Sequence, residues 1–270
     1  MRYVFGLILS LSIFAGLQAM AASADFDVGW RAFVKGDFET ARKAFRPLAE
    51  SGDVQAQYIL GEIYRWGYGV PSDPAAALGW YRLAAAQGDP RSQNNIGLMY
   101  AGGVGVPQDH REAAKWYLAA AEQGLAEAQT NLGYLYLNGL GLGRDYATAR
   151  KWTRAAADQG MAEAQFNLGM ISEKGLGVQR DYLAAAGWYA KAAAQGHGAA
   201  QYGLGRIHGN GYGVPRDLVQ AHMWFSLAAE NGIGEALQAR DVVAGRLTPT
   251  DLTRARALLR DYRAKHPKAK

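Results

Sequence analysis

Residues 52–87 read GDVQAQYILGEIYRWGYGVPSDPAAALGWYRLAAAQ, and this pattern returns every 36 residues. Glycine marks the period at Gly52, Gly88, Gly124, Gly160, Gly196 and Gly232. Tryptophan keeps the same step at Trp80, Trp116, Trp152, Trp188 and Trp224. A fixed period of this length is typical of stacked copies of one structural unit. We therefore expect five repeats, at residues 52–87, 88–123, 124–159, 160–195 and 196–231.

Each repeat is predicted to form a helix, a glycine-containing loop and a second helix. Asp53 can cap the first helix, because its carboxylate accepts orphan backbone N–H groups. That helix should end at Gly67, Asp73 should cap the second helix, and Gly88 should end it in a left-handed conformation. The predicted apolar stripes are Ala56, Leu60, Ile63 and Tyr64 on the first helix, and Ala77, Trp80, Tyr81 and Ala84 on the second.

A glycine also recurs in the middle of each first helix, as at Gly61. A glycine there costs about 1 kcal/mol relative to alanine, so we expect it where two helices approach closely. The predicted neighbours are small residues of the second helix, such as Ala84, Ala120 and Ala192. The tryptophan ladder is predicted to belong to the core. Because neither helix can bury its stripe alone, adjacent repeats must stack.

Residues 56–88, AQYILGEIYRWGYGVPSDPAAALGWYRLAAAQG, combine A-x-x-x-L-G-x-x-Y, G-x-G-V, D and A-x-x-W-Y-x-x-A-A-x-x-G. This pattern resembles the Sel-one-like repeat, a relative of the tetratricopeptide repeat, over about residues 27–245. Departures from the pattern stand at Gly143, Thr153, Ser172, Gln179 and His208. The resemblance implies an all-α fold, a right-handed α-solenoid of stacked helix–loop–helix repeats with about 14 helices including the caps.

The two ends of the chain differ from the repeat. Residues 22–51 lack the glycine loop, and Lys35-Gly36-Asp37 supplies the turn of a predicted N-terminal, tetratricopeptide-like cap hairpin. Residues 232–270 are predicted to hold C-terminal capping helices and a tail. Within them, Thr248-Pro249-Thr250-Asp251 predicts the start of the last helix, with a threonine cap and an acid three residues later.

Residues 1–21 have the pattern of a secretory signal peptide. Arg2 precedes an apolar run, and Ala19-Met20-Ala21 matches a small-residue cleavage site, so cleavage is expected after Ala21. The alternative is an uncleaved anchor, but glycine and polar residues interrupt the ~20 apolar residues that a span needs. The chain has no cysteine, which leaves no point for lipid attachment. We expect a periplasmic or secreted protein without membrane insertion after signal cleavage.

Composition and motifs exclude several classes of protein. The formal net charge is +5, with acids interspersed among the bases, whereas nucleic-acid binding needs a focused basic stripe. The G-x-G pairs follow helices and lack the third glycine of a dinucleotide site. Neither G-x-S-x-G nor S-x-x-K occurs. His208 and His222 could approach each other, but zinc takes three or four protein ligands. We expect no nucleic-acid partner, no enzyme, no catalytic residue, no metal and no cofactor.

The resemblance implies that the first helix of each repeat lines the concave side of the stack. Residues beside the apolar stripe would then form a surface for a protein or peptide partner, since aromatic and arginine side chains are frequent anchors. A solvated face without a partner is the alternative. Asn95, Asn131 and Asn167 form a further ladder that also fits the repeat pattern. The predicted site comprises Tyr58, Glu62, Trp66, Asn94, Leu98, Thr130, Tyr134, Phe166, Met170, Tyr202 and Arg206.

Three functions are considered for this surface. The leading hypothesis is an exported, non-enzymatic protein–protein interaction adaptor or scaffold in envelope assembly or signalling. The alternative is a glycan- or peptidoglycan-binding module that uses Tyr58, Trp66 and Tyr134. The third is hydrolysis of a cell-wall or β-lactam substrate, for which the sequence shows no nucleophile and base.

Overall fold

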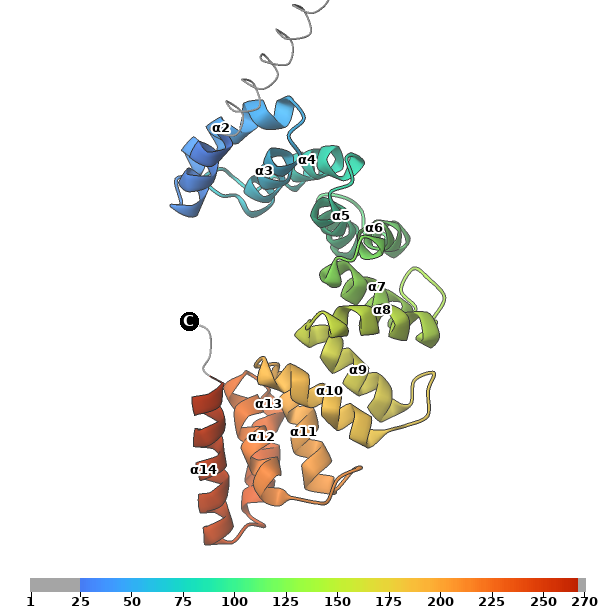
Figure 1. The fold of residues 1–270 in the computed structure, drawn as a ribbon, viewed down its shortest axis with the longest axis vertical. Coiled ribbons are helices and arrows are strands. Elements are labelled where there is room, and N and C mark those ends of the chain that lie inside the picture. Colours follow the sequence, from blue (N-terminus) through green and yellow to red (C-terminus); the bar gives the residue numbers. More distant parts are fainter. Residues whose placement is uncertain (1–24, 267–270) are drawn as a thin grey trace, which may run out of the picture. The chain divides into compact units, whose positions relative to one another are not determined.

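The computed structural model describes residues 25–266, and this part of the chain is all-helical, with fourteen helices and no strand (Figure 1). Residues 25–34 belong to the first helix. The others are α2 (Phe38–Glu50), α3 (Val54–Trp66), α4 (Pro74–Ala86), α5 (Pro90–Gly102), α6 (His110–Glu122), α7 (Ala126–Asn138), α8 (Tyr146–Asp158), α9 (Ala162–Lys174), α10 (Tyr182–Ala194), α11 (Gly198–Asn210), α12 (Leu218–Glu230), α13 (Gly234–Ala244) and α14 (Pro249–Lys265). The predicted helical solenoid is confirmed, whereas the predicted signal peptide lies outside the described residues.

The chain divides into two compact units, which join in sequence between Gln123 and Gly124. Among its described residues, the N-terminal unit holds the first helix and α2 to α6, and the C-terminal unit holds α7 to α14. In each unit the two helices of a hairpin pack together, and a second helix packs on the next first helix, as α4 does on α5 and α8 on α9. This stacking buries apolar stripes that a single hairpin would expose.

The local signals in one repeat act as the sequence predicts. The Asp53 carboxylate accepts the N–H of Ala56 at 2.8 Å and so caps α3. Gly67 ends α3 with a φ of 71°. Asp73 caps α4 in the same way, and Gly88, at a φ of 91°, follows its end. This hairpin therefore begins and ends at signals carried by its own residues, whereas α7 and α9 start after Leu125 and Met161 without a side-chain cap.

The recurring glycine inside each first helix lies at a close approach, but its neighbour is not the predicted alanine. A Cβ placed on Gly61 would lie 2.3 Å from Cε1 of Tyr81. The same contact recurs between Gly169 and Tyr189, at 2.4 Å from Cδ1. At Gly133 the neighbour is Thr153, and in the other four of the five repeats an aromatic ring thus occupies the space of a glycine side chain. The alanines of the second helix, including Ala84, are buried beside it.

The tryptophan ladder borders the core instead of filling it. Trp80, Trp116, Trp152, Trp188 and Trp224 are all partly exposed. The residue after each is the buried one, as for Tyr81, at 0% exposure, and Phe225, at 5%. The ring of Trp188 packs against one core cluster while Lys191 Nζ lies 4.1 Å from its centroid. The 36-residue recurrence of tryptophan does not tell whether the tryptophan or the residue after it is the buried one.

A ladder of buried amides holds successive hairpins together. Gln57 Nε2 donates to the carbonyl of Ala49 in α2 at 3.0 Å, and its Oε1 accepts Gln87 Nε2 at 2.9 Å. The amide pair recurs as Gln93–Gln123, Gln129–Gln159, Gln165–Gln195 and Gln201–Asn231. Each amide pair lies within one repeat, whereas the bond to the preceding second helix recurs from Gln93 to Ala85, from Gln165 to Ala157 and from Gln201 to Ala193. Because buried amides need hydrogen-bond partners, these bonds join successive hairpins.

The described parts of both ends follow their turn and cap signals. Gly36 has a φ of 79° in the turn before α2, and Asp37 accepts the N–H of Thr40 at 3.2 Å. Thr248 caps α14 by accepting the N–H of Asp251 at 3.1 Å. Within residues 25–266, no helix is long and apolar enough to cross a membrane.

Candidate interaction surface on the first helices

Every residue of the predicted site lies on a first helix. In the N-terminal unit, α3 carries Tyr58, Glu62 and Trp66, and α5 carries Asn94 and Leu98. In the C-terminal unit the residues are distributed over α7 (Thr130, Tyr134), α9 (Phe166, Met170) and α11 (Tyr202, Arg206).

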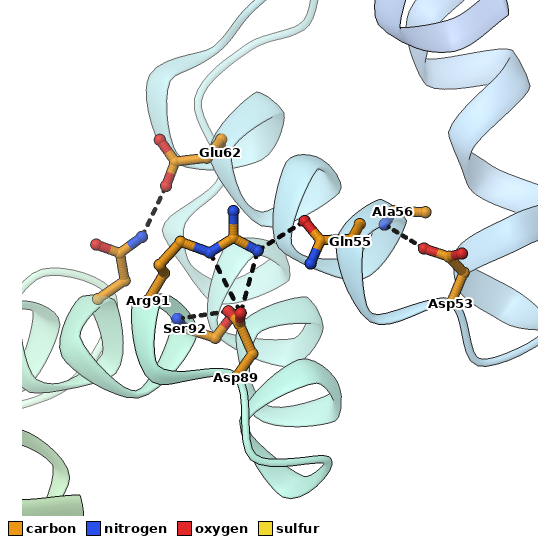
Figure 2. A network of polar contacts seen from close by, with 8 residues as sticks. Asp53, Gln55, Ala56, Glu62, Asp89, Arg91 and Ser92 are labelled. Carbon is orange, nitrogen blue, oxygen red and sulfur yellow. Dashed lines mark hydrogen bonds and ion pairs between the residues drawn. The ribbon is translucent and has the colours of Figure 1, made fainter. Parts of the chain in front are cut away.

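Glu62 is the centre of the polar contacts in the N-terminal unit. Its carboxylate accepts the hydroxyl of Tyr81 at 2.5 Å, Asn95 Nδ2 at 2.7 Å and Trp66 Nε1 at 3.1 Å. Figure 2 shows Glu62 pointing from α3 toward the amide on the neighbouring helix. Burial, followed by the Glu62 charge, raises the pKa of Tyr81, so the phenol remains a neutral donor. Glu62 therefore joins α3, α4 and α5.

A second contact joins α3 and α5 through Arg91. Its guanidinium donates to Gln55 Oε1 at 2.8 Å and to Asp89 Oδ1 at 3.1 Å, as Figure 2 shows. The same group lies 4.1 Å from the centroid of the Tyr58 ring. Because Asp89 also caps α5 through the N–H of Ser92, Arg91 lies between a helix cap and the preceding repeat. One face of Tyr58 is covered and unavailable for stacking.

Trp66 is the most open aromatic side chain of the predicted site, with 57% of its surface exposed. Its indole N–H is held by Glu62, and the Arg65 guanidinium lies 4.9 Å from its centroid. Arg65 Nη1 also donates to Asn95 Oδ1 at 3.1 Å. The ring is thus exposed yet fixed in orientation by its neighbours.

In the C-terminal unit the main polar contact is an ion pair between a buried carboxylate and a partly exposed arginine. Glu173 Oε1 lies 2.9 Å from Nη2 of Arg206, and Glu173 Oε2 accepts the Tyr189 hydroxyl at 2.7 Å. Glu173 is 9% exposed. Burial, and then the hydrogen bond to Glu173, raises the pKa of Tyr189. The predicted residue Arg206 is therefore engaged with α9 through a residue that the sequence did not single out.

Phe166 lies in an aromatic contact between α9 and α11. Its ring stacks on His197 at 4.7 Å and lies 5.7 Å from the ring of Tyr189. His197 Nδ1 accepts the N–H of Ala200 at 3.2 Å, so the proton of a neutral ring is on Nε2, which lies 2.9 Å from Glu163 Oε2. The hydrogen bond from His197 lowers the pKa of Glu163.

The remaining predicted residues differ widely in exposure. Tyr134 is 51% exposed, whereas Asn94 and Thr130 are each only 7% exposed. The Thr130 hydroxyl donates to the carbonyl of Ala126 at 2.8 Å. Leu98, Met170 and Tyr202 are partly buried. The N-terminal unit therefore gathers Tyr58, Glu62 and Trp66, and the C-terminal unit gathers Phe166 and Arg206, while Asn94 and Thr130 lie beneath the surface.

Sequence reasoning missed Glu173, Arg91 and His197. A signal exists for Glu173, because equivalent repeat positions hold Arg65, Ala101, Leu137 and Gly209. A single acid in a mostly apolar or small ladder indicates a specific pairing. Among residues 25–266, no group of three or more His, Cys, Asp or Glu side chains is arranged to hold a metal.

A family model described as the Sel1 repeat matches residues 54–89, 90–125, 126–161, 162–197 and 198–233. These boundaries begin two residues after the predicted ones. A search of curated proteins found no match.

Solved structures resemble the chain over most of its length. A protective antigen of uropathogenic Escherichia coli strains with an SLR fold is 36% identical, with a TM-score of 0.85, and covers 92% of this chain. This chain spans 55% of that antigen. A Sel1 repeat protein from Oxalobacter formigenes is 33% identical over 79% of this chain and 88% of its own, with a TM-score of 0.73.

Proposed function

We propose that this chain, which belongs to the Sel1 repeat family, is a non-enzymatic scaffold that binds a protein partner on its first helices. Sel1 repeat proteins are helical solenoids and typically serve as protein-interaction scaffolds. To this family role the proposal adds three points: the location of the binding surface, the export of the chain, and a role in envelope assembly or signalling.

The observation that carries the proposal is the state of Trp66. More than half of this large side chain is exposed, yet hydrogen bonding to Glu62 and the Arg65 guanidinium fix its position. Exposed aromatic residues anchor many interfaces, and an ordered anchor loses little conformational entropy when a partner docks. Tyr134 gives the C-terminal unit a second exposed aromatic residue on a first helix.

The acids on these helices are already paired with other side chains, which fits a scaffold better than a catalyst. Glu62 accepts three hydrogen bonds, and Glu173 is paired with Arg206 and Tyr189. The raised pKa values of Tyr81 and Tyr189 keep both phenols neutral at neutral pH. These acids and phenols satisfy one another, which is the arrangement of structural contacts between repeats.

The test is affinity capture from an envelope fraction, followed by measured binding of each purified partner. We expect Trp66→Ala and Tyr134→Ala to weaken binding by about tenfold or more, as truncation of an aromatic anchor does. Leu83→Ala and Leu183→Ala are matched controls, because these side chains are 50% and 64% exposed on second helices. Equal losses in both sets, or losses only in the controls, would move the binding surface away from the first helices.

The glycan-binding alternative is tested with the same variants. Purified peptidoglycan would be pelleted with the parent chain and with Trp66→Ala. Because Arg91 covers one face of Tyr58, we expect no dependence on this ring. Pelleting that requires Trp66, without any protein partner, would favour the glycan module instead.

Export is tested separately, because it depends on residues 1–21. We expect mass spectrometry of the chain from an envelope fraction to find a mature N-terminus at Ala22, after cleavage of the signal segment. Recovery of the chain with Met1 intact would contradict cleavage.

A further inference from the structure

The two units differ in charge. Residues 25–123 carry ten Lys and Arg against twelve Asp and Glu, whereas residues 124–266 carry sixteen against twelve. Much of this difference arises at one repeat position, the residue before the aspartate that caps each second helix. The N-terminal unit has Ser72 and Gln108 there, and the C-terminal unit has Arg144, Arg180 and Arg216.

The three arginines lie in loops that contact one another in turn. A Cβ placed on Gly177, in the α9–α10 loop, would lie 2.6 Å from Cβ of Tyr146, which follows Arg144 by two residues. A Cβ on Gly213, in the α11–α12 loop, would lie 2.8 Å from Cβ of Tyr182, which follows Arg180 by two residues. Figure 1 shows these loops on one side of the C-terminal unit. They form a continuous margin, here called the loop edge (residues 139–146, 175–182 and 211–218).

The cations of the loop edge are open. Arg144, Arg180, Arg216 and nearby Lys174 are exposed. The ion pairs among the described residues of the C-terminal unit all join other side chains. Arg216 Nε donates to the carbonyl of Gly209 at 3.0 Å, which fixes its stem and leaves the outer guanidinium nitrogens to solvent.

The neighbouring aspartates do not cancel this charge. Asp145, Asp181 and Asp217 each accept backbone N–H groups at the start of α8, α10 and α12. The positive end of each helix offsets the carboxylate that caps it. An anion that approaches the loop edge therefore meets, in each repeat, one exposed guanidinium beside a carboxylate whose charge the helix dipole partly offsets.

We propose that the loop edge of the C-terminal unit binds a linear acidic polysaccharide. Guanidinium groups match carboxylates in a two-point geometry, and one arginine per repeat fits a polymer with spaced anionic groups. Tyr212 lies between Arg180 and Arg216 in the chain, is 38% exposed and stacks on Tyr182 at 4.9 Å, which presents an aromatic surface to a sugar ring. A nucleic-acid duplex carries a charge about every 1.7 Å, which is a much denser array of anions than one arginine per repeat can match.

The test compares two triple variants of the full chain. The first, Arg144→Gln/Arg180→Gln/Arg216→Gln, removes the row of three arginines on the loop edge and is called the row variant. Glutamine is native at the equivalent Gln108, where it makes the same type of contact, to the carbonyl of Ala101 at 2.8 Å. The control Lys191→Gln/Arg256→Gln/Arg260→Gln removes the same charge from exposed sites on α10 and α14. Circular dichroism verifies folding, and the single Arg→Gln variants replace any triple variant that does not fold.

The probe is immobilised polygalacturonate, with neutral dextran as the uncharged reference. We expect the parent to bind polygalacturonate at about 50 mM salt and to weaken at about 200 mM. The row variant should bind at least about tenfold more weakly, as the loss of three surface contacts implies, and the control should bind like the parent.

Three results would overturn the proposal. The parent could fail to bind polygalacturonate, or both triple variants could weaken equally, which would indicate net charge alone. A single-stranded DNA oligonucleotide or phosphatidylglycerol vesicles could bind more tightly than polygalacturonate with the same dependence on the row. That outcome would assign the loop edge to a different class of partner.

Discussion

Tyr81 in the N-terminal unit and Tyr189 in the C-terminal unit occupy the same repeat position, and both donate a hydroxyl to a buried or partly buried glutamate. The acceptors stand at different positions. Glu62 stands three residues before the position that Glu173 occupies in its own repeat, which is the position of Arg65. Both positions face the same side of the first helix, three residues apart. Either position can therefore supply an acceptor for the buried phenol, although the equivalent Tyr117 has Leu98 and Ala101 at these positions.

The largest expected effect tests whether both units share the aromatic contact with a mid-helix glycine. Gly61→Ala and Gly169→Ala should each lower the free energy of unfolding by about 1–3 kcal/mol, because a Cβ would overlap Tyr81 or Tyr189. Urea unfolding followed by circular dichroism measures the change. Gly79→Ala is the control, since no heavy atom lies within 4 Å of its added Cβ, and it should stabilise by up to about 1 kcal/mol. Similar behaviour of Gly61→Ala and Gly79→Ala would contradict the close contact.

The next effect compares the two glutamates that accept a buried phenol. Glu173→Ala should cost about 1–3 kcal/mol, because it leaves the Tyr189 hydroxyl without its acceptor. In a Tyr189→Phe background the cost should fall substantially. Glu62→Ala should stay costly in a Tyr81→Phe background, because Asn95 and Trp66 still lose their acceptor. Equal coupling in the two double-mutant cycles would show that the carboxylates play the same role in spite of their different partners.

The third prediction is that the stability of the C-terminal unit depends on pH, because this unit holds His222. Burial, reinforced by Arg240 on α13 and Arg256 on α14 and opposed by Asp241, lowers its pKa from the ordinary 6.5. Above pH 6.5 the ring is neutral in folded and unfolded chains. As the pH falls below 6.5 the unfolded chain binds the proton first, so the free energy of unfolding decreases until the folded pKa is reached.

Urea titrations between pH 8 and pH 5 measure this decrease, with His222→Gln as the comparison variant. We expect the variant to show a smaller loss over this range. An unchanged pH profile in His222→Gln would assign the effect to other groups, such as His208, whose pKa is also lowered by burial.

The smallest expected effect concerns contacts between adjacent first helices. Arg91→Ala should cost about 0.5–1 kcal/mol, because it removes a half-exposed contact with Tyr58 and Asp89. Arg111→Ala, at an exposed site, should change nothing beyond error. The equivalent contact in the C-terminal unit is Glu163 with His197, since Gln55 and Asp89 hold those repeat positions. A cost in Arg91→Ala well above the expected range would show that the N-terminal unit depends on its helix-cap contact more strongly than predicted.

The order of the helices depends on local chemistry, and it could therefore be predicted from the sequence. Asp53, Gly67, Asp73 and Gly88 act within a few residues of their own positions. The glycines and the aspartate before each second helix recur in all five repeats, whereas Leu125 and Met161 replace the first-helix cap in two of them. The candidate surface could be read only in part. Tyr58, Glu62 and Trp66 lie on α3, where residues four apart share one side of the helix, and their role in binding stays a prediction.

The burial of individual first-helix residues could not be predicted from the sequence in this way. Asn94 and Tyr58 occupy the same repeat position, yet Asn94 is buried at 7% exposure while Tyr58 remains partly open. Side chains of the second helix and of the next repeat cover each first-helix position, and these side chains differ from copy to copy. The aromatic neighbour of Gly61 was missed for the same reason, since Trp80 and Tyr81 share a stripe and only packing selects which ring turns inward.

The sequence by itself determined the repeat, its length, its helix ends and its capping residues, because each depends on backbone preferences and hydrogen bonds within one hairpin. The tertiary structure decided which side chain covers each mid-helix glycine, which glutamates accept the hydroxyls of Tyr81 and Tyr189, and which arginines remain exposed on the loop edge. Those outcomes depend on contacts between hairpins, where a charge or an aromatic ring can be supplied from more than one position.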